Sequence, residues 1–368
     1  MTTPADLSQV VANFALDGAF LDAAPYGSGH INDTFAVRLR QADGAPRRYI
    51  LQRVNTTIFT EPAKLMENIA RVTDHLRGKL AAAGGDAERG ILRLFSTRAG
   101  EACHTDPAGR VWRVYAFIEG ARTFDLIASP QHAYQAARAF GEFQKLAADL
   151  PPPRLHETIP GFHDTPRRCR QFRETLARDA VNRAAGARAE IEFALSWESR
   201  AALLVDAQRQ GRLPERITHN DTKCNNVMID DATGAGLCVI DLDTVMPGLA
   251  VNDFGEAVRT GAATAAEDER DLARVGLRLD LFDAYTRGYL DAARDFLTPA
   301  ELDHLILAVQ TMTYENGLRF LTDHLAGDVY YKIHRPGHNL DRCRTQWAML
   351  REMDRHGDEM DRIVRQFR

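Results

Sequence analysis

The chain of 368 residues has no long apolar segment and few cysteines, and each absence excludes a class of protein. No apolar run approaches the roughly 20 residues that a membrane-spanning helix needs. The N-terminus lacks the basic-then-apolar order of a secretory signal peptide. The five cysteines are scattered and show no C-x-x-C spacing, which argues against a disulfide framework or a zinc site. We therefore expect a cytoplasmic protein with free thiols and no membrane partner.

Positive charge is also scarce, because 46 Lys and Arg stand against 51 Asp and Glu and the net charge is -5. Surfaces that bind nucleic acid normally carry an excess of basic residues, so we expect no nucleic-acid partner. The motifs G-x-S-x-G and H-E-x-x-H are absent, and the 12 histidines show no metal-ligand spacing. Serine-hydrolase and zinc-peptidase chemistry therefore have no support in this sequence.

The most informative segment that is present spans residues 217–243. It contains the motif H-x-D-x-x-x-x-N, in which Asp221 and Asn226 are the last two named positions, and then a short apolar strand that ends in Asp241. Phosphoryl transfer from ATP needs a carboxylate near the acceptor hydroxyl, and an amide and a second carboxylate to hold magnesium. The spacing is that of the protein-kinase catalytic loop and metal strand. We predict a catalytic Asp221, with Asn226 and Asp241 as magnesium ligands; the alternative is a polar turn between two strands.

The order of elements predicts two lobes. Alternating apolar residues predict strands at residues 35–40, 49–54, 91–95 and 111–118. Helical spacing is found within 61–76 and 130–150, and a short helix is expected within residues 1–22. Helical periodicity dominates after the brief Glu119-Gly120 break, which fits a hinge. We predict an α+β, bilobal, protein-kinase-like fold: a nucleotide-binding lobe, residues 1–118, with a small antiparallel sheet and a helix, and a larger, mostly α-helical lobe, residues 119–368, for catalysis and substrate binding.

Two segments of the first lobe are candidates for nucleotide binding through the main chain. The turn with Gly27, Ser28 and Gly29 allows backbone N–H groups to approach phosphates closely; the alternative is an ordinary hairpin turn. Phe117 and Ile118 end the strand that connects the lobes, where backbone groups can bind adenine edge-on. Their apolar side chains are equally consistent with a place in the core.

A kinase normally has a Lys on the next strand, which grips the phosphates and pairs with a helix Glu. Here the strand has no Lys, and Arg53 is the best replacement because a guanidinium binds phosphate in a bidentate way. Glu67 on the following helix is its predicted partner. The alternatives are a solvated strand residue and an exposed helix charge.

Other polar residues near the motif have predicted supporting roles. The D-F-G at 253–255 looks like the metal motif of protein kinases, but Asp241 already has that position. We predict that Asp253 caps the helix that follows, bonding to backbone or to the catalytic loop. Asp243 either faces the metal or stabilises its loop, and His219 braces the catalytic loop.

Residues 219–226 and 239–241 together resemble the aminoglycoside phosphotransferase and choline kinase-like superfamily, small-molecule kinases with a protein-kinase-like fold. Within it, several segments resemble the N-acetylhexosamine 1-kinase branch, and these are residues 26–35, 49–55, 65–69, 239–248 and 319–323. The resemblance implies ATP- and magnesium-dependent phosphorylation of the anomeric O1 of GlcNAc or GalNAc. It also implies that Asp221 orients or deprotonates this hydroxyl. His30, Arg319 and Tyr330 would bind the sugar, although the residues alone make Arg319 equally an exposed helix residue and Tyr330 a packing residue.

Two alternatives remain open. The first is another small-alcohol kinase of the same fold, acting on choline, homoserine, methylthioribose or an aminoglycoside. A cationic acceptor calls for an acidic or aromatic pocket, whereas residues 319–344 are rich in Arg, Lys and His, which favours a neutral sugar. The second is a non-catalytic nucleotide-binding pseudokinase, which would lack one of the three motif residues. The sequence leaves open the sugar epimer, the choice between ATP and GTP, and the oligomeric state.

Overall fold

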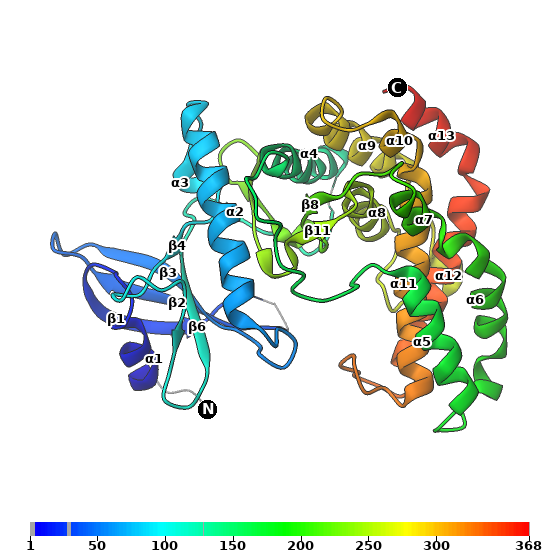
Figure 1. Ribbon diagram of the computed structural model, residues 1–368, viewed down its shortest axis with the longest axis horizontal. Coiled ribbons are helices and arrows are strands. Elements are labelled where there is room, and N and C mark those ends of the chain that lie inside the picture. Colours follow the sequence, from blue (N-terminus) through cyan, green and yellow to red (C-terminus); the bar gives the residue numbers. More distant parts are fainter. Residues whose placement is uncertain (1–3, 28–30, 128, 368) are drawn as a thin grey trace.

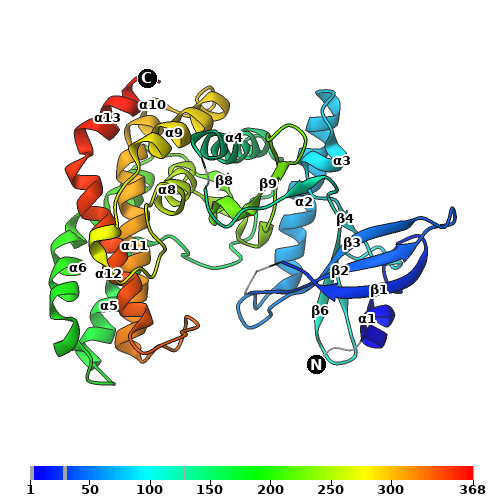
Figure 2. The same cartoon turned by 180° about the vertical axis from the view of Figure 1, so that it is seen from behind.

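The computed structural model of the chain describes residues 4–27, 31–127 and 129–367. A strand-rich part and a larger helical part lie side by side, as Figure 1 shows and as Figure 2 shows from behind. The predicted α+β, bilobal architecture is confirmed. Among the described residues, no helix is both long enough and apolar enough to span a bilayer.

The first lobe is built on a six-stranded antiparallel sheet with the order β1-β2-β3-β6-β4, in which β5 also pairs with β6. Its strands are β1 (Ala19–Pro25), β2 (Asp33–Arg40), β3 (Pro46–Arg53), β4 (Leu94–Phe95), β5 (His104–Thr105) and β6 (Val111–Ala116). Helix α1 (Pro4–Val11) packs on one face, in one cluster with Leu51 and Trp112. Helix α2 (Pro62–Ala82) packs on the other face with Ile50 and Tyr115. The two helices therefore cover opposite faces of the sheet, although Arg38 and Arg40 of β2 stay exposed.

The short helix predicted within residues 1–22 occupies Pro4–Val11, and the second half of that range is not helical. The helix ends at Val11, and residues from Ala19 onward form β1. Gly18 has φ +108°, and a Cβ there would lie 2.6 Å from the Arg40 carbonyl oxygen. Only glycine allows this close approach in a left-handed conformation. The chain therefore enters β1 beside the end of β2 instead of continuing as a helix.

Helix α2 begins with Pro62, which is compatible with the first helical turn because its missing N–H needs no partner there. Helix α3 (Ala87–Gly90) follows it. Asn68 of α2 bonds to two segments of the other lobe. Its Nδ2 donates to the carbonyl oxygens of His156 at 2.8 Å and Val245 at 3.1 Å, and its Oδ1 accepts from the His156 N–H. The helix is thus fixed to the second lobe by hydrogen bonds as well as by apolar contacts.

The second lobe is mostly helical. Its helices are α4 (Pro130–Ala147), α5 (Thr165–Arg178), α6 (Arg188–Ala201), α7 (Leu203–Arg209), α8 (Ala250–Gly261), α9 (Leu279–Ala293), α10 (Pro299–Asp303), α11 (Leu305–Ala326), α12 (His338–Arg355) and α13 (Gly357–Arg365). Helices α4 and α9 touch through small residues, and a Cβ at Gly288 would lie 2.1 Å from the Tyr134 carbonyl oxygen. This close packing fixes the backbone beneath the short strands that carry the polar motif.

Those short strands form two small antiparallel sheets, β10-β9-β7 and β11-β8. Their bounds are β7 (Ala121–Arg122), β8 (Arg216–Thr218), β9 (Val227–Asp230), β10 (Gly236–Val239) and β11 (Met246–Gly248). The 3₁₀ turns of this lobe are η1 (Ala184–Ala187), η2 (Cys224–Asn226), η3 (Leu242–Thr244) and η4 (Leu272–Arg274). The predicted catalytic loop therefore lies between β8 and β9, and Asp241 follows β10.

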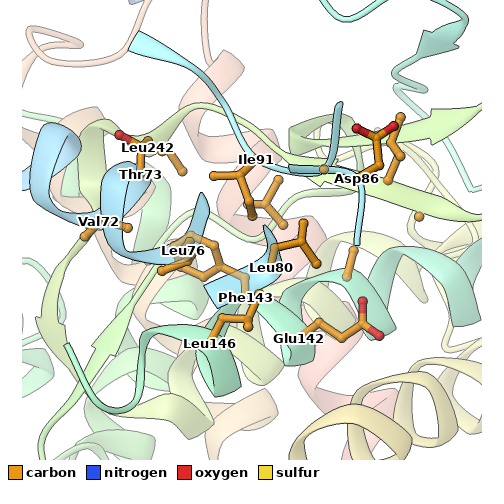
Figure 3. Close-up of a pocket in the computed structure, with 15 residues that line it drawn as sticks. Val72, Thr73, Leu76, Leu80, Asp86, Ile91, Glu142, Phe143, Leu146 and Leu242 are labelled. Carbon is orange, nitrogen blue, oxygen red and sulfur yellow. The ribbon is translucent and has the colours of Figure 1, made fainter. Parts of the chain in front are cut away.

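The two lobes share one hydrophobic cluster, and Ile91 forms a parallel bridge with Val239. Between α2, α3, α4 and β10 lies a cavity of about 220 Å³ lined mainly by apolar side chains, including Leu242. Figure 3 shows Leu76 and Phe143 at its apolar part. The boundary between the lobes is therefore packed rather than a loose linker.

Candidate functional site

The backbone of the catalytic loop is held by Asp253, which lies in the first turn of α8. Its carboxylate accepts the backbone N–H of His219 at 2.8 Å and of Asn220 at 2.7 Å, and it accepts from Nε2 of Gln144 at 2.6 Å. Its carbonyl oxygen accepts from the Thr222 hydroxyl. Burial raises the pKa of this carboxyl. The predicted bond to the catalytic loop is confirmed.

The predicted helix-capping role of Asp253 is wrong. The N-cap position of α8 belongs to Leu249, and no side chain caps it. Asp253 lies inside the helix and is only 1% exposed, so its oxygens face the neighbouring loop instead. The shape of the catalytic loop thus depends on a helix that follows it by some thirty residues.

His219 has the predicted bracing role. Its Nε2 donates to the carbonyl oxygen of Ile240 at 2.9 Å, and its Nδ1 accepts the Asp221 N–H at 3.3 Å. The ring also packs edge-on against Phe140, with a centroid distance of 5.4 Å. Because both ring nitrogens are occupied, His219 connects the catalytic loop to the segment that carries Asp241, and it is no candidate for a base.

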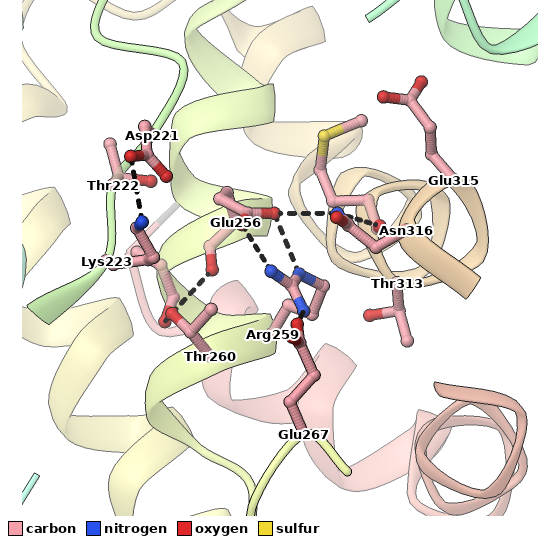
Figure 4. A network of polar contacts seen from close by, with 12 residues as sticks. Asp221, Thr222, Lys223, Glu256, Arg259, Thr260, Glu267, Thr313, Glu315 and Asn316 are labelled. Carbon is pink, nitrogen blue, oxygen red and sulfur yellow. Dashed lines mark hydrogen bonds and ion pairs between the residues drawn. The ribbon is translucent and has the colours of Figure 1, made fainter. Parts of the chain in front are cut away.

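Asp221 and Asn226 are brought together, as predicted. Nδ2 of Asn226 donates to the Asp221 carbonyl oxygen at 2.8 Å and to its Oδ2 at 3.1 Å. Nζ of Lys223 lies 3.0 Å from the same Oδ2, and Figure 4 shows this pair. Burial alone would lower the pKa of Lys223, but the Asp221 carboxylate outweighs it and raises the pKa. Sequence reasoning missed Lys223, although the D-x-K spacing inside the motif was the available signal.

Asp241 lies beside this pair, because the Ile240 N–H donates to the Asn226 carbonyl oxygen at 2.9 Å. Its backbone is left-handed, with φ 61°. The side chain keeps a solvent-exposed edge, yet the surrounding protein, with Asp243 and then Asp221, raises its pKa to about 7. Lys223 and Arg113 lower this pKa, but they offset only part of the effect of burial and of the neighbouring carboxylates.

This donor set fits magnesium. No group of three or more His, Cys, Asp or Glu side chains suited to a metal exists in the part of the chain that the structure describes. The site instead combines the Asp241 carboxylate with the Asn226 amide oxygen. Magnesium commonly takes one or two protein carboxylates together with water and substrate phosphates, so this sparse set of oxygen ligands is suitable.

Asp243 stabilises its loop, the second of the two alternatives. It is 3% exposed, and its Oδ1 accepts from Nη1 of Arg113 in a buried ion pair. Its Oδ2 accepts from Nδ2 of Asn32 at 2.6 Å. Both carboxylate oxygens are thus occupied by protein donors.

The predicted Arg53–Glu67 pair is wrong. Arg53 forms an ion pair with Asp33, its cross-strand neighbour. Glu67 instead lies 2.9 Å from Nε2 of His156. This contact, assisted by Arg71 and opposed by burial, lowers the Glu67 pKa. The cause is strand alternation, because Arg53 shares its face with Leu51, on the α1 side of the sheet. The face toward α2 and the other lobe carries Gln52.

The other predicted nucleotide-binding residues are partly described. Gly27 has φ +81° and open space around it, whereas Ser28, Gly29 and His30 lie outside the described residues. At the end of the connecting strand, the Phe117 ring lies edge-on to Tyr26 and 3.7 Å from the Arg48 guanidinium carbon. The roles of these residues toward a nucleotide remain predictions.

Ile118, the next residue, is buried in the cluster shared by the lobes. Its side chain is therefore core, and only its main chain is available to a ligand. An adenine contact through these backbone groups remains a prediction.

Arg319 and Tyr330 differ in their surroundings. The Arg319 guanidinium carbon lies 5.4 Å from the Phe162 ring and 5.6 Å from the Tyr331 ring. In the described part of the chain, no carboxylate forms an ion pair with it. Tyr330 is 64% exposed, and its N–H donates to Asp323. Arg319 is therefore enclosed by aromatic rings, whereas the Tyr330 ring reaches solvent beside Tyr331.

Two buried glutamates near the catalytic loop are already neutralised. Nδ1 of His163 donates to Glu315 at 2.8 Å, and its Nε2 lies 3.4 Å from the Asn220 carbonyl oxygen. Glu256 accepts two bonds from Arg259, and Figure 4 shows this network. Burial alone would lower the pKa of His163 and raise that of Glu315, but their mutual attraction reverses both shifts.

The His163–Glu315 pair predicts a pH dependence of stability. The pKa of His163 in the folded protein is raised above 6.5. Its contribution to the free energy of unfolding is therefore complete below pH 6.5 and is lost as the pH rises through the folded pKa. Since the folded pKa of Glu315 is lowered, its contribution is lost only toward low pH. We expect Glu315→Gln to lower the free energy of unfolding at pH 6 by about 3 kcal/mol.

Urea denaturation of the wild-type protein and of this variant between pH 5.5 and 8.5 measures the effect. The difference in stability between the two proteins should shrink as the pH rises. A difference that stays constant over this range would contradict a charged His163 partner. The remaining histidines do not confuse the result, because they are common to both proteins.

Comparison with known proteins places this geometry in a family. Residues 22–297 match the profile of the phosphotransferase enzyme family. Similar solved structures include a microcompartment-associated aminopropanol kinase, with TM-score 0.62 and 17% identity over 96% of this chain and 97% of that one. An aminoglycoside phosphotransferase from Alicyclobacillus acidocaldarius has TM-score 0.58 and 14% identity over 97% and 96%. A choline kinase from Cryptosporidium parvum has TM-score 0.58 and 12% identity over 96% of each chain. At these identities the likeness shows the shared fold.

Proposed function

Because the chain belongs to the phosphotransferase enzyme family, we propose that it is an ATP- and magnesium-dependent kinase of a neutral, polyhydroxylated acceptor. The acceptor that we propose is an N-acetylhexosamine, GlcNAc or GalNAc, phosphorylated on its anomeric O1. Family membership supports a phosphotransferase with an alcohol acceptor. The identity of the sugar rests on sequence segments such as 319–323 and on the charges around the acceptor side.

The charge balance around Arg319 is the observation that carries the choice of a neutral acceptor. Glu256 and Glu315 are two buried carboxylates of this region, and Arg259 and His163 already neutralise them. A third, Asp323, has its oxygens occupied by the N–H groups of residues 329–331 and by the Asn339 amide. Arg319 lies between aromatic rings without an ion-pair partner among the described residues. An ammonium acceptor would meet this guanidinium without a free carboxylate, whereas sugar hydroxyls and an acetamido oxygen accept its N–H groups.

The proposed mechanism follows from the catalytic loop. Asp221 accepts the proton of the acceptor hydroxyl as the oxygen bonds to the γ-phosphorus and ADP departs. Lys223, 3.0 Å from the same carboxylate, adds positive charge where negative charge develops on the transferred group. Asn226 and Asp241 are the residues that would hold magnesium, which neutralises phosphate charge when bound.

An acceptor panel tests the proposal. ATP consumption is measured with GlcNAc, GalNAc, glucose, choline, ethanolamine and 1-amino-2-propanol. We expect turnover with an N-acetylhexosamine, and phosphorus NMR should show a sugar 1-phosphate. Efficient turnover of an amino alcohol, with no turnover of any sugar, would contradict the proposal of a sugar acceptor. It would leave the proposal of a kinase unchanged.

Arg319→Met should raise the KM for the sugar by about 10- to 100-fold, the usual value of a hydrogen bond to a charged group. The KM for ATP should change little, because the substitution lies on the acceptor side. Arg351→Met is a matched control, since Arg351 also lies over an aromatic ring, 4.6 Å from the centroid of Phe193, on another helix. Steady-state kinetics of both variants give the comparison; an equal rise in both would contradict the role of Arg319.

A further inference from the structure

The sheet face toward α2 carries one buried cation, and it comes from β6 rather than β3. Arg113 pairs in register with Gln52 and shares a face with Tyr115, which belongs to the α2-side cluster. Nε of Arg113 donates to Oε1 of Gln52 at 3.0 Å, and its guanidinium lies over the Tyr115 ring. On β3, a protein kinase would have its lysine on this face.

The partner of Arg113 lies in the other lobe. Its Nη1 donates to Oδ1 of Asp243, a residue 130 positions later in the chain. The side chains are 1% and 4% exposed, so water screens this pair little. Asp243 follows Asp241 by two residues, and Leu242 between them packs in the cluster shared by both lobes.

The same carboxylate also binds the turn before β2. Oδ2 of Asp243 accepts from Asn32, and Oδ1 of Asn32 accepts the backbone N–H of Asn55 at 2.9 Å. The carbonyl oxygen of Asp243 accepts from the Thr158 hydroxyl at 3.0 Å. Asp243 is therefore the point at which the sheet, the segment just before β2 and the connection between α4 and α5 meet.

We propose that Arg113 is a positioning residue for the magnesium–nucleotide site, acting through Asp243 on the turn that presents Asp241. This inference rests on the proposed kinase function. The Arg113–Asp243 pair takes over the task of tying the sheet to the rest of the site, which a strand lysine and a helix glutamate perform in protein kinases. Arg53 and Glu67 are directed elsewhere.

A purely stabilising role explains the pair poorly. Removing two charges from water costs about as much as their attraction returns, and apolar replacements of similar volume are often neutral or stabilising. The pair instead fixes the orientation of the Asp243 carboxylate. Because Asp243 follows Asp241 by two residues, it also fixes the turn that carries Asp241. Residues that orient metal ligands from the outer shell typically change metal affinity 10- to 100-fold when replaced.

Four variants separate positioning from stability: Arg113→Met, Asp243→Asn, the double variant, and Arg113→Lys. The first readout is the magnesium concentration that half-maximally promotes binding of fluorescent mant-ADP, which needs no acceptor and no turnover. The second is the urea midpoint of unfolding. Arg38→Met is the matched control, because it removes an ion-paired arginine from the same sheet, where Arg38 pairs with Asp22 of the neighbouring strand β1.

Each single variant should raise the half-saturating magnesium concentration at least about tenfold and lower the urea midpoint, because one buried charge is left unpaired. The double variant should regain much of the urea midpoint but keep the shifted magnesium dependence. Arg113→Lys retains the charge and should fall between wild type and Arg113→Met. Arg38→Met should stay within about twofold of wild type, since outer-shell effects require contact with the site.

A double variant with wild-type magnesium dependence would overturn the inference, and so would a folded Arg113→Met protein with unchanged magnesium dependence. An Arg38→Met effect as large as that of Arg113→Met would also overturn it. Failure of the proposed function looks different, because wild-type protein would then not bind mant-ADP at all. If mant-ADP binds but no sugar is phosphorylated, only the choice of acceptor fails.

Discussion

Asp221→Asn is expected to lower kcat by about 10²- to 10⁴-fold, the range of a positioned general base. The substitution keeps the size of the side chain and leaves an oxygen for Nδ2 of Asn226, which now lies 3.1 Å from the carboxylate. It removes the negative charge that faces Nζ of Lys223 and the proton acceptor for the sugar hydroxyl. The affinity for mant-ADP should change little, because the lost function concerns the acceptor.

Asp231→Asn is the control for this prediction. Asp231 forms an ion pair with Arg122 at a half-exposed position away from the catalytic loop. Steady-state kinetics and mant-ADP titration of both variants give the comparison. A kcat for Asp221→Asn within about fivefold of wild type would be too small for general-base catalysis and would refute this role.

Asp253→Ala is expected to lower the free energy of unfolding by about 3–5 kcal/mol. The substitution leaves the backbone N–H groups of His219 and Asn220 and the Gln144 amide without their acceptor. Each buried donor without a partner costs about 1–3 kcal/mol, partly offset by relaxation. The turnover rate should fall as well, because the same bonds shape the loop that carries Asp221.

Asp271→Ala is a matched control for Asp253→Ala. Asp271 also accepts a backbone N–H, that of Ala273, but it lies at an exposed 3₁₀ turn. Its replacement should lower the free energy of unfolding by about 1 kcal/mol, as for other exposed helix caps. Urea denaturation measures the free energy of unfolding of both variants. An equal decrease in the two would show that the buried bonds of Asp253 stabilise the fold no more than an exposed cap does.

The lobes and the core of the site could be predicted because their signals are local. Asp221 and Asn226 belong to one loop, and Asp241 follows the β9–β10 hairpin that directly continues this loop, so short-range spacing brings them together. Lys223 was within reach of the same reasoning, since it lies two residues beyond Asp221 in the motif. Contacts between distant segments carry no such local signal.

The error at Arg53 has a specific cause. Strand alternation placed Gln52 and Arg53 on opposite faces, but apolar residues occupy both faces of β3, since α1 covers one and α2 the other. The pattern of apolar residues in β3 therefore does not indicate which face of the strand borders the second lobe. Arg113 was overlooked for a related reason, because a buried arginine is recognised only through its partner, and Asp243 lies in the other lobe.

The left-handed backbone of Asp241 has a consequence for how this sequence can vary. A side chain in that conformation costs roughly 1 kcal/mol or more relative to glycine, and its carboxyl stands in the field of two further carboxylates. Glycine at this position would relieve both penalties. Asp241→Gly should therefore stabilise the folded chain while it removes the proposed magnesium ligand, so the fold and the chemistry favour different residues at this position.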